Sequence, residues 1–273
     1  MSEFPHLNKQ PSWEGRKPIP PEKAIFEFEY EFAQIMQKRT SLPLAEIICS
    51  YTQELKNNTT LFNSLHNKRV QRENVPWDDV VNFAFTQSYE DSLTRDDVYA
   101  RIASTETFGR VGCFYFDYPS RLAENAIGIH FTNCELDVAS PLSEEKLQVR
   151  RQEMRELLKD VLKRFPSVQT VVGKSWLYNV PAYRHFFPTS YLNGLEIDFN
   201  EEQWGRGSTI WGQFIDSQSK LKTKQAEAFL SRLRTLPSGQ PLSDLYSEDG
   251  VLLPPLTTYG PIEDFYTMYG IHQ

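Results

Sequence analysis

The spacing of apolar residues changes near residue 105, and this change constrains the fold more than any other feature. Before it, apolar residues recur every three or four positions, which is the period of an amphipathic helix. After it, they alternate with other residues, which is typical of strands. Examples of the two patterns are Ile25, Phe28, Phe32 and Ile35 before the change and Ile127, Ile129 and Phe131 after it. The sequence therefore predicts a helical region followed by a sheet.

The second part of the chain is predicted to be a mixed sheet with helices on its faces. A long amphipathic helix is expected to begin near Ser140 and Pro141 and to end at Pro166, because proline suits a first turn but cannot continue a helix. Since a helix separates consecutive strands twice, the sheet is expected to be mixed. The expected strands cover residues 111–118, 127–132, 168–175, 195–199 and 209–215.

These patterns describe an α+β protein in four segments. The last segment is acidic, since no Lys or Arg follows Pro237, and it is rich in aromatic residues such as Tyr259 and Tyr269. A like-charged tail usually stays in solvent, but this one is apolar enough to pack along the body as an extended strap. The predicted segments are a flexible N-terminal segment at 1–20, a helical region at 21–105, a mixed-sheet α/β domain at 106–236 and the acidic, aromatic C-terminal strap at 237–273.

Charge and composition exclude several functional classes. The chain has 29 basic and 36 acidic residues, a formal net charge of −7, which disfavours a protein that binds nucleic acid mainly through phosphate contacts. It contains no run of eighteen apolar residues, so no membrane-spanning segment is expected. Its three cysteines lack CxxC spacing and leave an odd thiol, which favours a reducing compartment and hence the cytoplasm. The oligomeric state is left open.

Polar and aromatic residues gather directly after the strand predicted at 168–175. In open α/β sheets, ligands usually bind at this end of a strand. Aromatic faces beside cationic side chains can hold an anionic or sugar-like small molecule. In the alternative interpretation, the aromatic residues belong to the core or its rim. The expected ligand-binding residues are Lys174, Trp176, Asn179, Tyr183, Arg184 and His185, together with Trp211 and Gln213 from a glycine-containing stretch further along the chain.

Three residues are candidates for acid–base chemistry near that cluster. His130 lies on the polar side of its predicted strand and is the expected general base, while Ser175 or Tyr178 would donate a proton. The side chains of His130, Trp176 and Arg184 are expected to converge on one concavity. No HExxH or HxH pair occurs, so no metal site is assigned, and no cofactor follows from the sequence. A histidine that only makes a structural hydrogen bond is the alternative.

Several short strings in the second half of the chain form a recognisable set. They are Gly128-Ile129-His130-Phe131, Ser140-Pro141-Leu142-Ser143, Phe165-Pro166, Gly173-Lys174-Ser175-Trp176-Leu177-Tyr178-Asn179 and Phe187-Pro188. Together they resemble a family of bacterial proteins of unassigned function that have a GNAT-like C-terminal domain, related in architecture to N-acetyltransferases. The resemblance covers about residues 110–236 and leaves the helical N-terminal half unmatched. It implies a GNAT-like mixed sheet and an acyltransferase-like activity on a small molecule.

The chain departs from the GNAT pattern where those enzymes bind the pyrophosphate of acetyl-CoA. They place a glycine-rich turn before the long helix, so that backbone N–H groups receive the phosphates. Here the junction from Cys134 to Pro141 has no glycine, and Glu135 and Asp137 would repel a diphosphate. Its proline also lacks an N–H group. Acetyl-CoA is therefore not expected to bind in the usual mode.

Three functional hypotheses follow. The first is a small-molecule enzyme, acyltransferase-like, in which Lys174 and Arg184 clamp an anionic group. The second is a non-catalytic ligand-binding or regulatory module, which the missing cofactor turn favours. The third is a protein-interaction protein whose aromatic tail, 259–269, contacts a partner.

Overall fold

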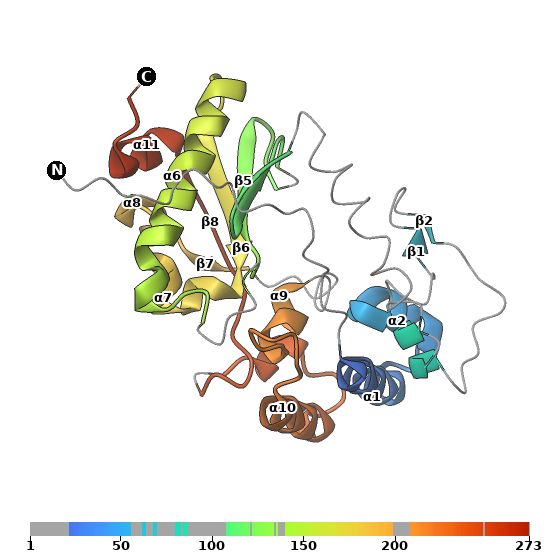
Figure 1. Cartoon of the computed structure of the whole chain (residues 1–273). Coiled ribbons are helices and arrows are strands. Elements are labelled where there is room, and N and C mark those ends of the chain that lie inside the picture. The colour runs from blue at the N-terminus through green and yellow to red at the C-terminus, as the bar shows by residue number, and fades with distance from the viewer. Residues whose placement is uncertain are drawn as a thin grey trace.

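The computed structural model of this chain is an α+β fold, in which a six-stranded mixed sheet stands beside a helical lobe (Figure 1). It describes residues 22–55, 62–63, 68–69, 80–82, 84–86, 108–120, 122–133, 135, 140–198, 208–247 and 249–272. None of the helices within these ranges combines the length and apolarity that a membrane span requires.

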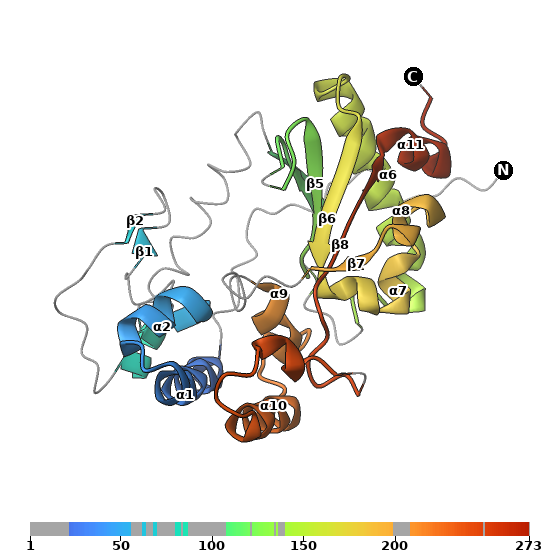
Figure 2. The ribbon, with the colours of Figure 1, turned by 180° about the vertical axis from the view of Figure 1, so that it is seen from behind.

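The sheet has the strand order β3-β4-β5-β6-β8-β7. Strands β5 and β6 run parallel, and the other neighbouring pairs are antiparallel. Figure 2 shows β6 and β8 side by side near the middle of the sheet. The strands are β3 (Phe108–Val111), β4 (Phe114–Asp117), β5 (Ala126–Phe131), β6 (Thr170–Ser175), β7 (Glu196–Ile197) and β8 (Leu256–Pro261).

Helices cover one face of this sheet, which we call the helix face, and the opposite side is the far face (Figure 1). Helix α6 lies there because Met154, Leu158 and Val161 form a buried stripe at helical spacing, which belongs to the same hydrophobic core as Ile127 and Ile129 of β5. The covering helices are α6 (Leu147–Arg164), α7 (Pro181–Arg184), α8 (Thr189–Asn193) and α11 (Ile262–Tyr269), with the 3₁₀ turns η2 (Glu144–Lys146) and η3 (Trp176–Asn179).

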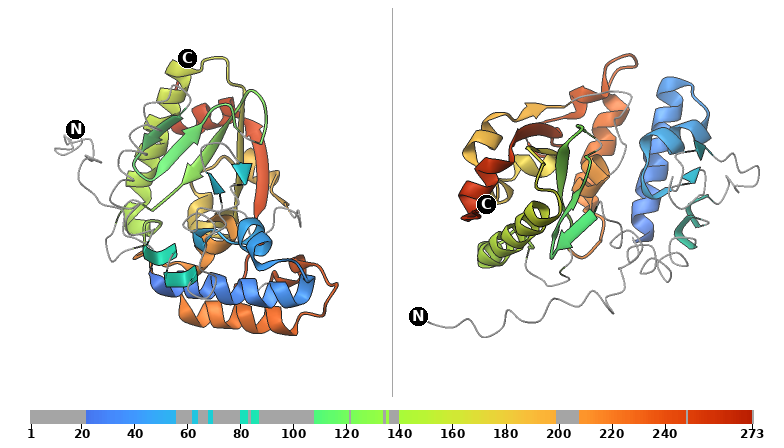
Figure 3. Two further views of the ribbon diagram at one scale, coloured as in Figure 1. Left: turned by 90° about the vertical axis from the view of Figure 1, so that its right-hand side faces the viewer. Right: turned by 90° about the horizontal axis from the view of Figure 1, so that it is seen from above.

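The helical lobe joins segments that lie far apart in the sequence. Phe28 packs edge-on against Trp211 and Phe214, with ring centroids 5.5 and 4.9 Å apart. Figure 3 shows α1 and α10 side by side below the sheet. The lobe comprises α1 (Lys23–Thr40), α2 (Leu44–Tyr51), α9 (Ser208–Trp211), α10 (Thr223–Thr235) and the 3₁₀ turns η5 (Gly212–Phe214) and η6 (Leu242–Leu245).

The strand predicted over 209–215 is wrong, because these residues form α9 and η5. Trp211 and Phe214 both pack against Phe28, and residues three apart share a face in a helix but not in a strand. The apparent alternation of apolar residues over 209–215 therefore comes from helical spacing, because a stretch this short does not distinguish the two periods.

The C-terminal segment packs against the body, as predicted, but it is not one extended strap. Residues 242–245 form η6 in the helical lobe, 256–261 form β8 inside the sheet, and 262–269 form α11. Strand β8 fits between β6 and β7 because its buried residues, Leu256 and Thr258 among them, alternate with more exposed ones. The core of the lobe thus contains residues from three of the four predicted segments, including Leu242 and Leu252.

Smaller differences concern turns and boundaries. The strand predicted over 111–118 forms as β4 from Phe114 onwards. Its first residues belong to a hairpin with β3, where Gly112 adopts a positive φ of 57° and turns the chain. Residues 62–63 and 68–69 pair as the short strands β1 and β2, so the N-terminal region is not purely helical. The long helix begins with η2 at Glu144, after Pro141. Segment 1–20 and the boundary near residue 105 lie outside the described residues.

Candidate functional site

The parallel pair β5 and β6 stops pairing before either strand ends. Residues 126–128 of β5 pair with residues 170–172 of β6. Each strand then continues for three residues, to Phe131 and Ser175. The carboxyl ends of adjacent parallel strands are the usual place for ligands in open sheets, so this separation marks the candidate site.

His130 and Lys174 share the far face at this point. Successive side chains of a strand point to opposite faces, and Gly128 pairs with Val172. The residues two positions further on, His130 and Lys174, therefore lie on the same face as that pair. Ile129 packs into the core of the helix face. The prediction that His130 lies opposite the apolar side of its strand is confirmed.

His130 is held by two residues of β4. Its Nε2 lies 3.0 Å from Oδ1 of Asp117, and its ring stacks on Tyr115 with centroids 4.7 Å apart. Gly128 makes room for this pair, because a Cβ there would lie 2.2 Å from the same Asp117 oxygen. The side chains of His130 and Asp117 remain 38% and 30% exposed. The imidazole is thus oriented and still reachable from solvent.

Lys174 is held in a similar way on the other side of the separation. Its Nζ lies 2.8 Å from Oδ2 of Asp198, and the hydroxyl of Thr257 donates to that oxygen at 2.9 Å. Partial burial disfavours the charged carboxylate, but the hydrogen bonds from Lys174 and Thr257 hold the pKa of Asp198 below its usual value. The ammonium group is therefore fixed by an ionised partner.

The site lies where the sheet meets the helical lobe. Asn133, two residues past β5, donates through Nδ2 to the carbonyl of Ser217 at 3.0 Å. Asn179, just after β6, donates to the carbonyl of Pro254 at 2.8 Å. These bonds tie one strand end to the loop between η5 and α10 in the lobe, and the other to the segment that leads from the lobe into β8. Boundaries between two structural units are a preferred place for small-molecule sites.

Ser175 and Tyr178 stabilise the turn that follows β6. Ser175 Oγ accepts a hydrogen bond from the N–H of Leu177 at 3.1 Å and so caps η3. The Tyr178 side chain is fully buried on the helix face, where its hydroxyl bonds that of Tyr191 at 3.0 Å. Burial raises the pKa of Tyr178 well above its usual value. Gly173 leaves room for the Tyr178 hydroxyl, because a Cβ there would lie 2.1 Å from it.

The remaining residues predicted after β6 follow the chain towards the helix face. Asn179 also donates to the carbonyl of Trp176 at 2.9 Å, and Arg184 donates through Nε to the carbonyl of Tyr178 at 2.5 Å. Tyr183 is buried in the aromatic core, and His185 is exposed after α7. No contact among the described residues joins Trp176 or Arg184 to His130, so the convergence of these three side chains stays a prediction.

Trp211 and Gln213 lie in the helical lobe. Trp211 donates through Nε1 to the carbonyl of Tyr51 at 3.1 Å. Gln213 is buried and pairs with the backbone of Leu253, donating to its carbonyl at 2.9 Å and accepting from its N–H at 2.8 Å. Both side chains therefore link segments of the lobe.

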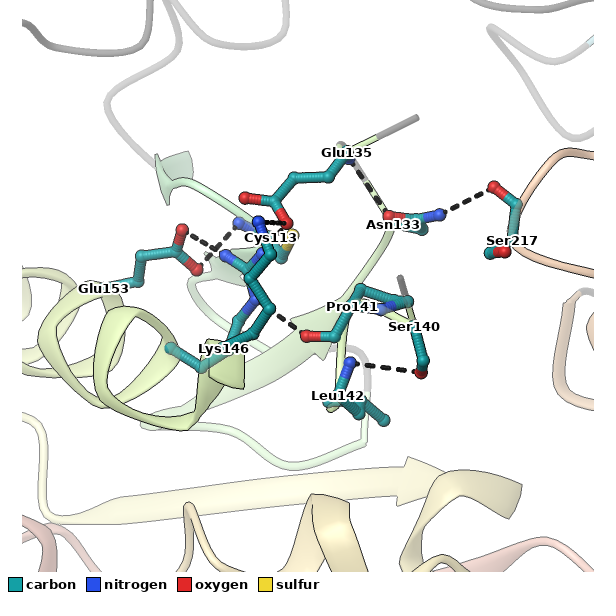
Figure 4. Close-up of polar contacts among 10 residues, drawn as sticks. Cys113, Asn133, Glu135, Ser140, Pro141, Leu142, Lys146, Glu153 and Ser217 are labelled. Atoms are coloured by element: carbon teal, nitrogen blue, oxygen red, sulfur yellow. Dashed lines mark hydrogen bonds and ion pairs between the residues drawn. The ribbon is translucent and has the colours of Figure 1, made fainter. Parts of the chain in front are cut away.

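A second charged cluster lies at the start of α6, where the resemblance implies a pyrophosphate site (Figure 4). The carboxylate of Glu135 contacts Lys146 at 3.0 Å and Arg150 at 2.6 Å. Arg150 is fully buried, bonds Glu153 as well, and donates through Nε to the carbonyl of Pro141 at 3.0 Å. Two cations and two carboxylates thus pair with one another.

The charges of this cluster suit each other rather than an added anion. Burial opposes the ionised form of Glu135, but hydrogen bonds from Arg150 and Lys146 lower its pKa. Burial raises the pKa of Glu153 despite the bond from Arg150. Because Glu135 already occupies the cationic groups beside the helix start, these residues do not fit the pyrophosphate of acetyl-CoA.

The residues that hold the two clusters in place were not predicted from the sequence. The burial of Arg150 could have been predicted, because this residue lies four positions before Met154 and therefore on the apolar stripe of α6. Asp117 and Asp198 had no such signal, because each is defined by pairing between strands.

No group of three or more metal-ligating side chains occurs in the described part of the chain. Comparison with protein-family models, curated proteins and solved structures finds no match.

Proposed function

We propose that this chain binds a polar, sugar-like small molecule at the carboxyl ends of β5 and β6. The observation that supports the proposal most is the placement of His130 and Lys174 on one face, each held by its own carboxylate. Such a site offers hydrogen-bond donors and acceptors together, as a polyhydroxylated ligand requires. A strongly anionic ligand is disfavoured, because Asp117 and Asp198 would face it.

We propose in addition that the protein is not a CoA-dependent acyltransferase, although the GNAT resemblance implies one. The cluster of Glu135, Lys146 and Arg150 supports this view, since its charges are already paired. The resemblance itself remains a proposal about ancestry, supported by the β5–α6–β6 order. We also propose a cytoplasmic location, which the cysteine usage supports.

A thermal-shift panel of sugars, sugar phosphates, nucleotides and acyl-CoA thioesters tests the proposal. A ligand present at a hundred times its Kd stabilises the folded state by about 2.7 kcal/mol, which raises the Tm by roughly 5 °C or more. We expect a sugar-like compound to produce this rise and CoA thioesters to produce none.

Variants connect such a ligand to the site. His130→Ala and Lys174→Ala should each reduce the ligand-induced shift, while His272→Ala and Lys159→Ala, which change exposed residues elsewhere, should leave it unchanged. An undiminished shift in both site variants, or stabilisation by CoA alone, would overturn the proposal.

The geometry of His130 favours a second candidate function, catalysis with this residue as general base. Asp117 engages Nε2, so Nδ1 can accept a proton from a ligand hydroxyl. Any compound that stabilises the protein should then be incubated with it and followed by NMR. If the protein converts the compound, and His130→Gln abolishes this conversion while binding persists, catalysis by His130 is established. If the compound stays unchanged, the result supports the binding function without catalysis.

A further inference from the structure

A shallow depression lies at the opposite end of β6 from His130 and Lys174, and it does not depend on the proposed function. It forms where β6 begins, β8 ends and α11 starts, near the top of Figure 1. About 520 Å³ of space, open to solvent, is available in it. The depression is lined by Gln169, Thr170, Tyr259, Gly260, Pro261 and Glu263.

Tyr259 dominates this depression. This residue is 74% exposed, the largest fraction among the exposed large hydrophobic residues described, while Thr258 beside it is buried. Alternation along β8 turns the ring to the far face, where Tyr259 pairs with Val172 in register. A large aromatic ring left in solvent beside a concavity is typical of a surface that meets a ligand.

The charge of the depression indicates the kind of ligand. Its residues include one carboxylate, on the exposed Glu263, and no Lys or Arg. The neighbouring Asp264 is engaged, because Ser190 donates to it at 2.5 Å, whereas no described residue forms an ion pair with Glu263. The amide of Gln169 and the hydroxyl of Thr170 add acceptors. An aromatic face beside a carboxylate suits a cation.

We propose that this depression binds an organic ammonium group, with the ring of Tyr259 as its cation–π surface and Glu263 as its counter-charge. The same group occurs in free polyamines and quaternary amines and in lysine side chains of peptides. The cation is held by the ring face and the carboxylate together, so each should contribute separately to affinity.

NMR titration of the full chain tests this proposal with a matched pair of ligands. Choline and its neutral isostere 3,3-dimethyl-1-butanol have the same shape and differ in charge. We expect choline to give saturable shifts of the amide signals of Gln169, Thr170 and Gly260, and the alcohol to give none. Spermidine and a tripeptide with one lysine distinguish free amines from peptides, and saturation by either supports the ammonium class.

Three variants separate the two contacts. Tyr259→Leu should weaken choline binding by about two- to fivefold, the effect of an exposed cation–π contact, and Tyr259→Phe should preserve it. Glu263→Gln should weaken binding and reduce its salt dependence, while Glu227→Gln, on the exposed side of α10, should change nothing. Equal shifts from alcohol and choline, no saturation with any cation, or unchanged binding in both Tyr259→Leu and Glu263→Gln would overturn the proposal.

Discussion

Two charged clusters of this protein use similar residues in opposite ways. At the start of α6, Arg150 is fully buried and its partners Glu135 and Glu153 are mostly buried. At the strand ends, His130 and Lys174 also pair with carboxylates, but these groups are 21 to 38% exposed. The first cluster serves the fold, because buried charges must be paired. The second is in contact with solvent, and the proposed ligand would meet its charged groups there.

Removing the cation from the buried cluster is expected to have the largest effect. Arg150→Ala leaves Glu135 and Glu153 facing each other without a guanidinium, which should lower the free energy of unfolding by about 3–5 kcal/mol. Arg151→Ala, one position along and exposed, is the matched control and should change it by less than about 0.5 kcal/mol. Urea denaturation measures both. Equal free energies of unfolding in the two variants would show that the buried cluster does not stabilise the fold.

Glu29 extends the comparison, because it is a buried carboxyl bonded by backbone groups instead of a cation. It accepts hydrogen bonds from the N–H groups of Gln53, Glu54 and Leu55 at 3.2, 3.0 and 2.8 Å. Burial, with a contribution from the charge of Glu54, raises its pKa from 4.5 to about 8. Between these values the folded state holds a proton that the unfolded state has lost, so stability falls as pH rises.

The expected slope for Glu29 is at most about 1.4 kcal/mol per pH unit. Denaturation from pH 4.5 to pH 8 should show this loss in the parent protein and a flatter profile in Glu29→Gln, which has no proton to release. Glu27→Gln, exposed on the same helix, should retain the parent slope. Identical profiles in all three proteins would mean that Glu29 is ionised throughout this range.

Two glycines test whether the two faces of the strand ends differ in rigidity. A Cβ at Gly173 would lie 2.1 and 2.5 Å from the hydroxyls of Tyr178 and Tyr191 in the packed core. Gly173→Ala should therefore cost about 1–3 kcal/mol, and adding Tyr178→Phe should restore part of it. Gly128→Ala on the far face should cost less, since the half-exposed carboxylate of Asp117 can move aside. The reverse order of the two costs would contradict this distinction.

The smallest effect is expected for the far-face pairs themselves. Asp117→Asn and Lys174→Met should each change stability by no more than about 1 kcal/mol, as is usual for ion pairs in contact with solvent. The same urea experiment measures this change. A loss as large as that of Arg150→Ala would place these residues in the fold and weaken their assignment to a ligand.

Local patterns were sufficient for part of the fold and of the site. The α+β class, strand β6, the long helix α6 and the far-face position of His130 follow from spacing within about twenty residues. The partners of His130 and Lys174 do not. Asp117 depends on the register between β4 and β5, and Thr257 on strand β8, which was expected to be a strap.

The sequence by itself determined which residues are apolar, how they repeat, and therefore where β5, β6 and α6 form. Only the tertiary structure decided that the C-terminal segment enters the sheet, that residues about 180 apart build the helical lobe around Phe28 and Trp211, and that Arg150 is buried. Hydrophobic periodicity is a property of one segment, whereas strand order and charge pairing depend on which distant segment arrives beside it.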